Sequence, residues 1–519
     1  MGYKEVQINL PVELFEKEMN ERILKKAGVK TGRVSFLRKS LDSRKKDRIV
    51  WNTLAGVLSD ELPDGTPPPP PRSAMESLLD ENYRKGRNKR VVIVGSGPAG
   101  LFAGLTLLRL GYAVTLLERG AAVEDRARLI QSFEEGGAFS PVGNYLFGEG
   151  GAGTFSDGKL TSRTKKIVRE RDWIHSLYVS MGGPEEILWS THPHLGSDRL
   201  YTIAQNMRLL FREWGGEIEF ETLMTDLKVR EGRIVSLDTN RGEREGDFFL
   251  LAPGHSARET YRMLLDRGVP FRGKNFAIGF RMEHRQEEIN LTQWGRTSLP
   301  GVKAAEYRLT HKTVGNIPVY TFCMCPGGQV VPSTPYEDNN LVNGMSSYAR
   351  NGLYANAALV AGIQPQEIDR SGSPRTVLDW LEGLESRFKS IVDGYEAPAS
   401  TIEAFLAGKT GILSQTSYPL GLKEWDLAKE LPPAQIEALK EGLGAFVRKM
   451  PRFGEGQLLG LESKTSAPLQ VLRDESGRPE GWDNLWICGE GSGWSGGIIS
   501  SAADGIKGAL SLLKLDSAT

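Results

Sequence analysis

The sequence predicts an α/β protein in which a doubly wound, Rossmann-type domain carries an inserted mixed α/β domain and follows a small α+β module. Three observations lead to this fold class. An apolar strand, a glycine-rich turn and a helix rich in alanine and leucine begin at Arg90. A second strand, glycine-rich turn and helix begin at about Asp483. From about Phe271 to Pro451, short strands and loops alternate with a few amphipathic helices.

The N-terminal module is predicted as a strand, a helix and two further strands. "EVQINL" alternates as a strand does, and apolar residues then recur at helical spacing from Val12 to Ile23. "RVSFL" and "RIVWNTLAGVL" resemble strands, and the basic run "RKSLDSRKKDR" lies between them. This run is either a solvated hairpin tip or an arm for an anionic partner. The proline-rich stretch from Leu62 to Ser73 cannot join a helix or a central strand, so we interpret it as a spacer.

The chain therefore divides into five expected segments. They are a small α+β module (residues 1–58), a proline-rich linker (59–89), the first part of the cofactor-binding domain (90–270), an inserted substrate or cap domain (271–455) and the C-terminal part of the cofactor-binding domain (456–519).

Composition narrows the class of protein. The chain has 519 residues and a formal net charge of zero, so no overall field favours nucleic acid or an anionic membrane. Three cysteines are too few for a disulfide framework and fit a reducing compartment. The polar start "MGYKEVQINL" lacks the layout of a secretory signal. We therefore expect a cytoplasmic protein without a membrane span.

The turn after the first apolar strand carries a dinucleotide fingerprint. Gly95, Gly97 and Gly100 form G-x-G-x-x-G between a strand and a helix, and Glu118 ends the next strand eighteen positions later. The first glycine makes the turn, the second admits a pyrophosphate, the third lets helix and strand pack, and the acid can accept ribose hydroxyls. The helix N-terminus adds partial positive charge. This context predicts a bound dinucleotide.

The C-terminal segment favours FAD over a nicotinamide cofactor. Glu490 follows a strand and can hold a ribityl hydroxyl, and the next helix N-terminus can point at the flavin ring. Two distant parts of one chain closing on an extended cofactor is the FAD arrangement. The sequence has no second well-placed G-x-G-x-x-G, so a separate NAD(P)H domain is not supported.

The stretch from Gly148 to Arg163 resembles a triphosphate loop, because G-x-x-x-x-G-K ends at Lys159. Leu160 occupies the place of the Mg²⁺-binding Ser or Thr, and the preceding "NYLF" is a poor strand. We interpret these glycines instead as backbone that approaches the flavin ring.

These motifs are similar to those of a large bacterial family of FAD-dependent dehydrogenases, single-Rossmann, glutathione-reductase-like flavoproteins that have no settled substrate. The resemblance covers nearly the whole chain and rests on "VGSGPAGLFAGL", "FGEGGAGTFSDGKLTSR", "HPHLGSDRL", "LAPGHSAR", "AIGFRMEH", "CMCPGG" and "CGEGSGWSGGIISSAADGIKGA". The resemblance implies FAD contacts at Gly95, Ser96, Gly97, Pro98, Ala99, Gly100, Glu118, Arg119, Arg126, Gly151, Ala152, Gly153, Ser156, Lys159, Met224, Pro253, Gly254, Gly489, Glu490, Gly496, Gly497 and Ile498.

Two residues are candidates for catalysis. Lys159 could stabilise reduced flavin or an oxyanion, or it could form a salt bridge with Asp157 that shapes its loop. His255, after the turn over the cofactor, is a candidate acid or base, or it makes a structural hydrogen bond. Ser156 donates to the flavin or caps a helix. Lys464 lines a substrate cavity or caps a turn.

The remaining reactive side chains give weaker signals. Cys323 and Cys325 form C-x-C, which fits either packing near the active site or thiol redox chemistry. His192 and His194 could share a metal, but no third and fourth ligand is apparent, so we expect none.

We expect an oxidoreductase that transfers a hydride between flavin N5 and a small organic substrate, with NAD(P)H or a redox protein as external electron donor. A flavin-bound scaffold or redox sensor without turnover is one alternative. A flavoenzyme that acts on RNA through the basic run is the other, although nucleic acid is not the favoured partner.

Overall fold

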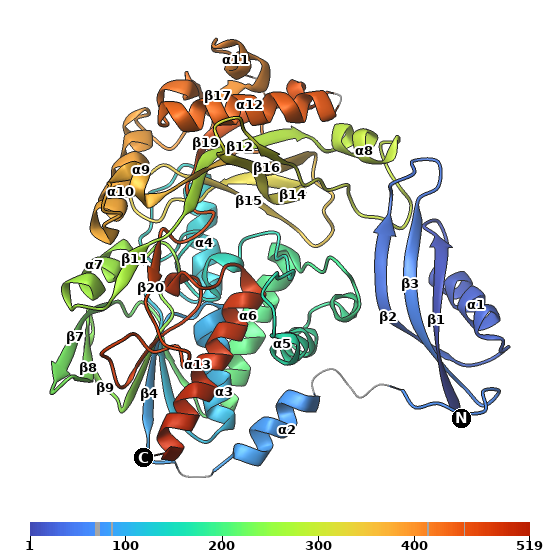
Figure 1. Ribbon diagram of the computed structural model, residues 1–519, viewed down its shortest axis with the longest axis horizontal. Coiled ribbons are helices and arrows are strands. Elements are labelled where there is room, and N and C mark those ends of the chain that lie inside the picture. The colour runs from blue at the N-terminus through green and yellow to red at the C-terminus, as the bar shows by residue number, and fades with distance from the viewer. Residues whose placement is uncertain (68–72, 85–86, 413–414, 451, 519) are drawn as a thin grey trace.

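The computed structural model describes residues 1–67, 73–84, 87–412, 415–450 and 452–518 of the chain (Figure 1). Parallel and antiparallel sheets, with helices packed on them, confirm the predicted α/β fold class. The proline run expected to separate the module from the rest falls largely on residues 68–72, outside the described residues.

A five-stranded parallel sheet forms the centre of the cofactor-binding part. Its order is β21-β10-β4-β5-β6, so the strand nearest the C-terminus lies beside β10 and completes one edge. The strands are β4 (Arg90–Val94), β5 (Ala113–Leu117), β6 (Glu217–Glu219), β10 (Phe248–Leu251) and β21 (Leu485–Ile487). Val91 to Ile93 and all of β10 are buried, as expected for strands covered on both faces.

Two helices from opposite ends of the chain pack together on this sheet (Figure 1). They are α3 (Pro98–Arg109) and α13 (Ile498–Ala518). Nine residues of α3 are buried, which explains its apolar sequence. At the crossing, a Cβ on Gly505 would lie 2.0 Å from the carbonyl oxygen of Ala99, so only glycine admits this approach.

Further helices and a small sheet complete this part of the molecule. The helices are α2 (Ser73–Asn82), α4 (Val123–Glu134), α5 (Val168–Ser180), α6 (Gly196–Glu213) and α7 (Arg258–Asp266). The antiparallel sheet has the order β7-β8-β9, with strands β7 (Met224–Arg230), β8 (Arg233–Thr239) and β9 (Gly242–Glu245).

The inserted part is built on an eight-stranded sheet. Its strands are β12 (Phe276–Arg285), β13 (Thr310–Lys312), β14 (Pro318–Pro332), β15 (Val342–Ser346), β16 (Tyr354–Ile363), β17 (Ala397–Thr401), β18 (Leu422–Glu424) and β19 (Gln457–Glu462). Its helices are α8 (Gln286–Trp294), α9 (Pro365–Ile368), α10 (Pro374–Ser390), α11 (Ile402–Ala407) and α12 (Pro433–Lys449). A two-stranded sheet of β11 (Phe271–Gly273) and β20 (Leu469–Val471) joins this part to the cofactor-binding part.

The return from the inserted sheet comes later than residue 456, where the sequence pattern places it. β19 pairs with β12 and β17, so residues 457–462 belong to the eight-stranded sheet. The strand is buried throughout, and an isolated strand sequence does not show which sheet will bury it.

The N-terminal module is an antiparallel sheet of order β1-β3-β2 with one helix against it (Figure 1). Its elements are β1 (Gly2–Pro11), α1 (Glu16–Ala27), β2 (Arg33–Asp42) and β3 (Val50–Ser59). Half of the basic run lies in β2. Lys39 of β2 donates its backbone N–H to the carbonyl of Trp189 at 2.9 Å and accepts from Thr191 N–H at 3.1 Å. The module therefore contacts the segment that leads to His194.

Among the described residues, no helix is long and apolar enough to span a membrane.

Candidate functional site

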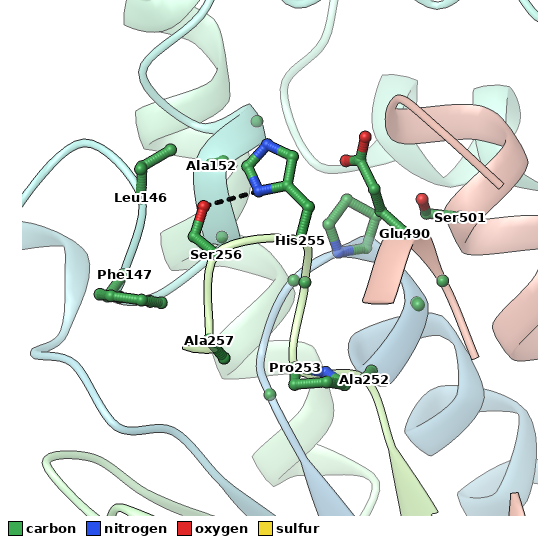
Figure 2. Close-up of a pocket in the computed structure, with 18 of the residues that line it drawn as sticks. Leu146, Phe147, Ala152, Ala252, Pro253, His255, Ser256, Ala257, Glu490 and Ser501 are labelled. Carbon is green, nitrogen blue, oxygen red and sulfur yellow. Dashed lines mark hydrogen bonds between the residues drawn. The ribbon is translucent and has the colours of Figure 1, made fainter. Parts of the chain in front are cut away.

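A cavity of about 440 Å³ opens beyond the carboxyl ends of β4, β10 and β21. Ligands of open parallel sheets bind at this edge. One wall is made of the loops that follow these strands, and Phe322 and Cys323 of β14 contribute to the opposite side. Figure 2 shows the turn from Ala252 to Ala257, with Phe147 and Glu490 on neighbouring segments.

Most of the residues predicted to contact FAD line this cavity. They are Gly95, Gly97, Pro98, Ala99, Glu118, Arg119, Gly151, Ala152, Gly153, Ser156, Lys159, Met224, Pro253, Gly254, Gly489, Glu490, Gly496, Gly497 and Ile498. Ser96, Gly100 and Arg126 do not line it. The structure thus brings together segments that lie up to four hundred residues apart in the sequence.

The glycine fingerprint shapes the entrance to α3. A Cβ on Gly100 would lie 1.9 Å from the carbonyl oxygen of Gly95, so the third glycine packs the helix against the turn. Gly97 is the N-cap of α3, and the Gly151 backbone lies close against it. The N-terminus of α3 therefore faces a cradle without side chains, which fits a pyrophosphate.

Glu118 joins three segments of this wall. Its carboxylate accepts from Ser96 N–H at 2.9 Å and Ser96 Oγ at 2.7 Å, from Gly120 N–H at 2.8 Å and from Gly148 N–H at 3.2 Å. Four donors use most of the acceptor capacity of a carboxylate. Glu118 lines the cavity where the ribose was predicted, and it also fixes the glycine turn.

Arg126 supports the wall from behind. Its guanidinium is fully buried and donates to the carbonyls of Asn144, Glu149 and Gly151 at 2.8 to 2.9 Å. Among the described residues, its Nη2 has no hydrogen-bond partner. Arg126 therefore holds the loop that approaches Gly97 and keeps one donor atom unused.

The C-terminal segment lines the flavin end. α13 begins at Ile498, so its N-terminus opens into the cavity beside Gly496 and Gly497. Glu490 is half-buried, and burial raises the pKa of its carboxyl to about 7 despite the opposing effect of Lys274. An acid that is partly protonated at neutral pH can donate or accept a hydrogen bond from a polyol.

Lys159 lines the cavity and forms the ion pair with Asp157. Its Nζ lies 2.9 Å from Asp157 Oδ2 and also donates to the Met324 carbonyl. Burial lowers the pKa of Lys159, but Asp157 together with Cys325 and Cys323 outweighs it, so the net pKa is raised. Arg350 donates to the same carboxylate at 2.6 and 3.1 Å. Lys159 is thus a fixed cation that joins the cofactor wall to β14.

Asp157 itself is almost completely buried. Burial alone would raise the pKa of its carboxyl, but Lys159 and Arg350 together hold the pKa well below its usual range. Ser346 of β15 also donates to it. Asp157 therefore ties both cations to one buried point.

His255 lies on the turn after β10. Its Nδ1 is 2.7 Å from Ser256 Oγ (Figure 2), and the imidazole also hydrogen-bonds the backbone of Lys464. Burial, followed by the Lys464 cation, lowers the pKa of His255 to about 3. The imidazole is neutral at neutral pH, so it can accept a proton only from a group that becomes strongly acidic.

Some lining residues were predicted without a choice of role, and others were missed. Lys464, for which the sequence left a cavity-lining role and a turn cap open, lines the cavity and also forms a 2.7 Å ion pair with Glu385 of α10. Thr465 beside it was missed. Phe322 and Thr161 were missed, and Cys323 was assigned to packing or redox chemistry without a choice. Ser156 lines the cavity and donates to the Gly153 carbonyl at 2.6 Å. Only the positions of β14 and of residues 464–465 in the fold could have identified these residues.

The part of the chain that the structure describes holds no group of three or more His, Cys, Asp or Glu side chains that could bind a metal. His194 is buried, and its Nε2 lies 3.1 Å from the Tyr348 carbonyl. His194 therefore has a structural partner.

The fold and the cavity define a FAD-binding α/β protein. Family models agree: "FAD binding domain" matches residues 88–132, and "FAD-dependent protein, C-terminal domain-like" matches residues 275–465. A protein of Clostridium beijerinckii, described as uncharacterized, is 35% identical over 522 residues, 96% of each chain. The chain belongs to this family of FAD-dependent proteins, and FAD is its cofactor. It is a flavoprotein with the redox cofactor of an oxidoreductase.

Solved structures are more distant. CtdE in complex with FAD aligns over 84% of this chain and 88% of that chain, with 11% identity and a TM-score of 0.33. A geranylgeranyl bacteriochlorophyll reductase-like protein of Thermoplasma acidophilum aligns over 83% and 79%, with 10% identity and a TM-score of 0.37. Scores this low carry no conclusion about this chain.

Proposed function

We propose that the protein is a FAD-dependent dehydrogenase or reductase of the single-Rossmann, glutathione-reductase-like type. FAD supplies the chemistry of hydride transfer at N5. A small organic substrate would bind in the same cavity, between the glycine-rich loops and the side chains of β14 and residues 464–465.

The observation that carries this proposal is that the cavity has two different linings, one of glycine backbone and helix N-termini and one of polar side chains. Much of the cofactor side is glycine backbone and helix N-termini, which suits a pyrophosphate and a flavin ring. Lys159, His255 and Lys464 come from other segments and converge on the same space. Few convergent polar groups in an otherwise apolar pocket are typical of a substrate site.

We assign Lys159 the role of an electrostatic partner. Its ammonium is held by Asp157 and the Met324 carbonyl, so it does not need to reorganise when negative charge develops on reduction. His255, held neutral by burial, is the candidate hydrogen-bond partner of the substrate.

The test is Lys159→Met in the holoprotein. We expect FAD to remain bound, because the glycine cradle is intact, while anaerobic reduction slows by about 100- to 1,000-fold, the range for losing one preorganised donor. Lys165→Met, at an exposed position in the same segment, is the control and should leave the rate unchanged. Unchanged reduction in Lys159→Met would leave this residue only its structural ion pair.

The electron donor or acceptor is proposed to be NAD(P)H or a redox protein. Anaerobic mixing with NADH, NADPH and candidate metabolites, followed by flavin absorbance, distinguishes them. A flavin that no donor reduces and no acceptor reoxidises would overturn the proposed activity and favour a non-catalytic scaffold.

A further inference from the structure

β14 is irregular where it reaches the cavity. Cys323 has a φ of 43°, in the left-handed region that a non-glycine residue rarely adopts. The pairing with β16 shifts between Phe322 and Cys325, so a bulge interrupts the strand there. Bulges next to sites re-aim side chains. Here Cys323 lines the cavity, while Cys325 is fully buried.

The two thiols are reduced and in contact. The Cys325 side chain hydrogen-bonds the Cys323 side chain, and its Sγ also lies 3.3 Å from the Cys323 carbonyl. Arg281 of β12, fully buried, donates to the Cys323 carbonyl at 2.7 Å and to Cys325 Sγ at 3.3 Å. The same guanidinium forms a 3.1 Å ion pair with buried Glu462, so it holds the cysteine pair from a fixed position.

Charged groups of both signs surround the pair. Lys159 and Arg281 act on both sulfurs, opposed by the acids Asp157, Glu462 and Glu490. The hydrogen bond from Cys325, against the effect of burial and helped by the two cations, lowers the pKa of Cys323 to about 6. The same contact and burial raise the pKa of Cys325. The pKa values of the two thiols are therefore shifted in opposite directions, and Cys323 is the one that loses its proton first.

We propose that Cys323 and Cys325 are a redox-active dithiol that exchanges two electrons with the FAD of the same cavity. In the oxidising direction, the Cys323 and Cys325 sulfurs join in a disulfide as the S–H bond of Cys325 breaks. The proton of Cys325 and two electrons pass to FAD, so thiolate, thiol and oxidised FAD become disulfide and singly anionic reduced FAD. Atoms, electrons and charge balance, and Lys159 remains as the cation beside the site.

This inference deepens the proposed function, because it adds a second redox group to the same site. It rests on the proposed function only in taking a redox-active flavin in that cavity as the electron acceptor. Disulfide exchange begins from a thiolate and depends on access. Cys323 meets both requirements, whereas buried Cys488, whose pKa burial raises, meets neither.

The test is an anaerobic reductive titration of the oxidised holoprotein with dithionite. The wild-type protein should take up two electrons per FAD for the flavin and two more for the disulfide. Cys325→Ala and Cys323→Ser should take up only those of the flavin, and Cys488→Ala, the matched control, should behave as wild type. Mass spectrometry of the oxidised protein should show the peptide that contains both residues two hydrogen atoms lighter.

A second measurement is independent of flavin reduction. Alkylation of the holoprotein by iodoacetamide, read by peptide mass, should label Cys323 with a midpoint near pH 6, and Cys325→Ala should move this midpoint upward. If Cys325→Ala does not fold, Cys323→Ser, at the partly exposed position, provides the electron count.

Wild-type uptake of two electrons only, or a Cys323 midpoint near that of an ordinary thiol, would overturn the dithiol. Reduction of the flavin by an organic substrate would still support the proposed function, so the two proposals can fail separately.

Discussion

The two walls of the cavity differ in whether backbone or side chains face the ligand. The cofactor wall consists largely of backbone: the turns after β4 and β21, the loop at Gly151 and the N-termini of α3 and α13. The opposite wall presents side chains, with Cys323 on β14 and Lys464 and Thr465 after β19. Lys159 and Asp157, which pair with each other, connect the two walls. Lys159 donates to a carbonyl of β14, and Asp157 accepts from a side chain of β15 and from Arg350.

This difference separates binding from chemistry. Backbone N–H groups and helix dipoles recognise phosphate and flavin whatever the substrate is. Side chains on the inserted sheet can change without disturbing that recognition. The cofactor wall therefore suits FAD whatever the substrate is, and under the proposed function the opposite wall would select the substrate.

The largest effect on stability should follow from removing the Asp157 ion pairs that connect the two walls. Asp157→Asn leaves Lys159 and Arg350 without their buried counter-charge, and we expect a loss of about 3–5 kcal/mol in the free energy of unfolding. Urea denaturation measures it. Asp338→Asn, whose exposed carboxylate pairs with Arg258, should cost about 1 kcal/mol or less. Equal losses in both variants would show that the buried ion pairs of Asp157 contribute no more to stability than an exposed ion pair.

The second-largest effect should come from substituting a glycine in the turn of the cofactor wall. Gly100→Ala places a methyl group against the Gly95 carbonyl, so we expect about 1–3 kcal/mol of destabilisation and loss of FAD from the turn. The flavin absorbance that remains after gel filtration measures it.

Gly383→Ala is the matched control for this glycine, because a Cβ there meets nothing within 4 Å in the middle of α10. It should keep FAD and gain roughly 0.5–1 kcal/mol. A Gly100→Ala protein that retains its FAD would contradict the close-packed turn.

The smallest effect should come from the inserted sheet. His284 lies in β12, stacks on Phe453 and places Nε2 2.8 Å from the Phe453 carbonyl; burial lowers its pKa to about 4. The unfolded chain takes up this proton near pH 6.5 and the folded protein only near pH 4, so its contribution to stability falls as pH decreases through this window.

His284→Phe keeps the stacking but loses the hydrogen bond. It should cost about 1 kcal/mol at neutral pH, and the difference from wild type should shrink and change sign towards pH 4. Thermal unfolding at several pH values checks this. Parallel pH profiles for both proteins would show that folding does not shift the pKa of His284.

The sequence predicts much of the cofactor wall because backbone recognition imposes fixed spacings. Gly95, Gly97 and Gly100, followed by Glu118, identify the turn without any knowledge of the rest of the fold. Lys464 shows the opposite case, because its place in the cavity depends on β19 and β20 pairing with strands almost two hundred residues earlier. The bulge at Cys323 is equally hard to predict, because the proline and glycines of "TFCMCPGG" come after Cys325, whereas the register already shifts between Phe322 and Cys325. Arg126 marks a third limit: the resemblance implies a FAD contact, and the structure gives its donors mainly to loop carbonyls.

The sheet order β21-β10-β4 also has a consequence for synthesis on the ribosome. β21 and α13 close the edge of a sheet whose first strand, β4, leaves the ribosome almost four hundred residues earlier. Until residue 485 and those after it emerge, β10 has an unpaired edge and α3 lacks the helix that covers it. Such long-range closure is slow and exposes apolar surface. We therefore expect the cavity to take its final shape only after β21 and α13 have been synthesised.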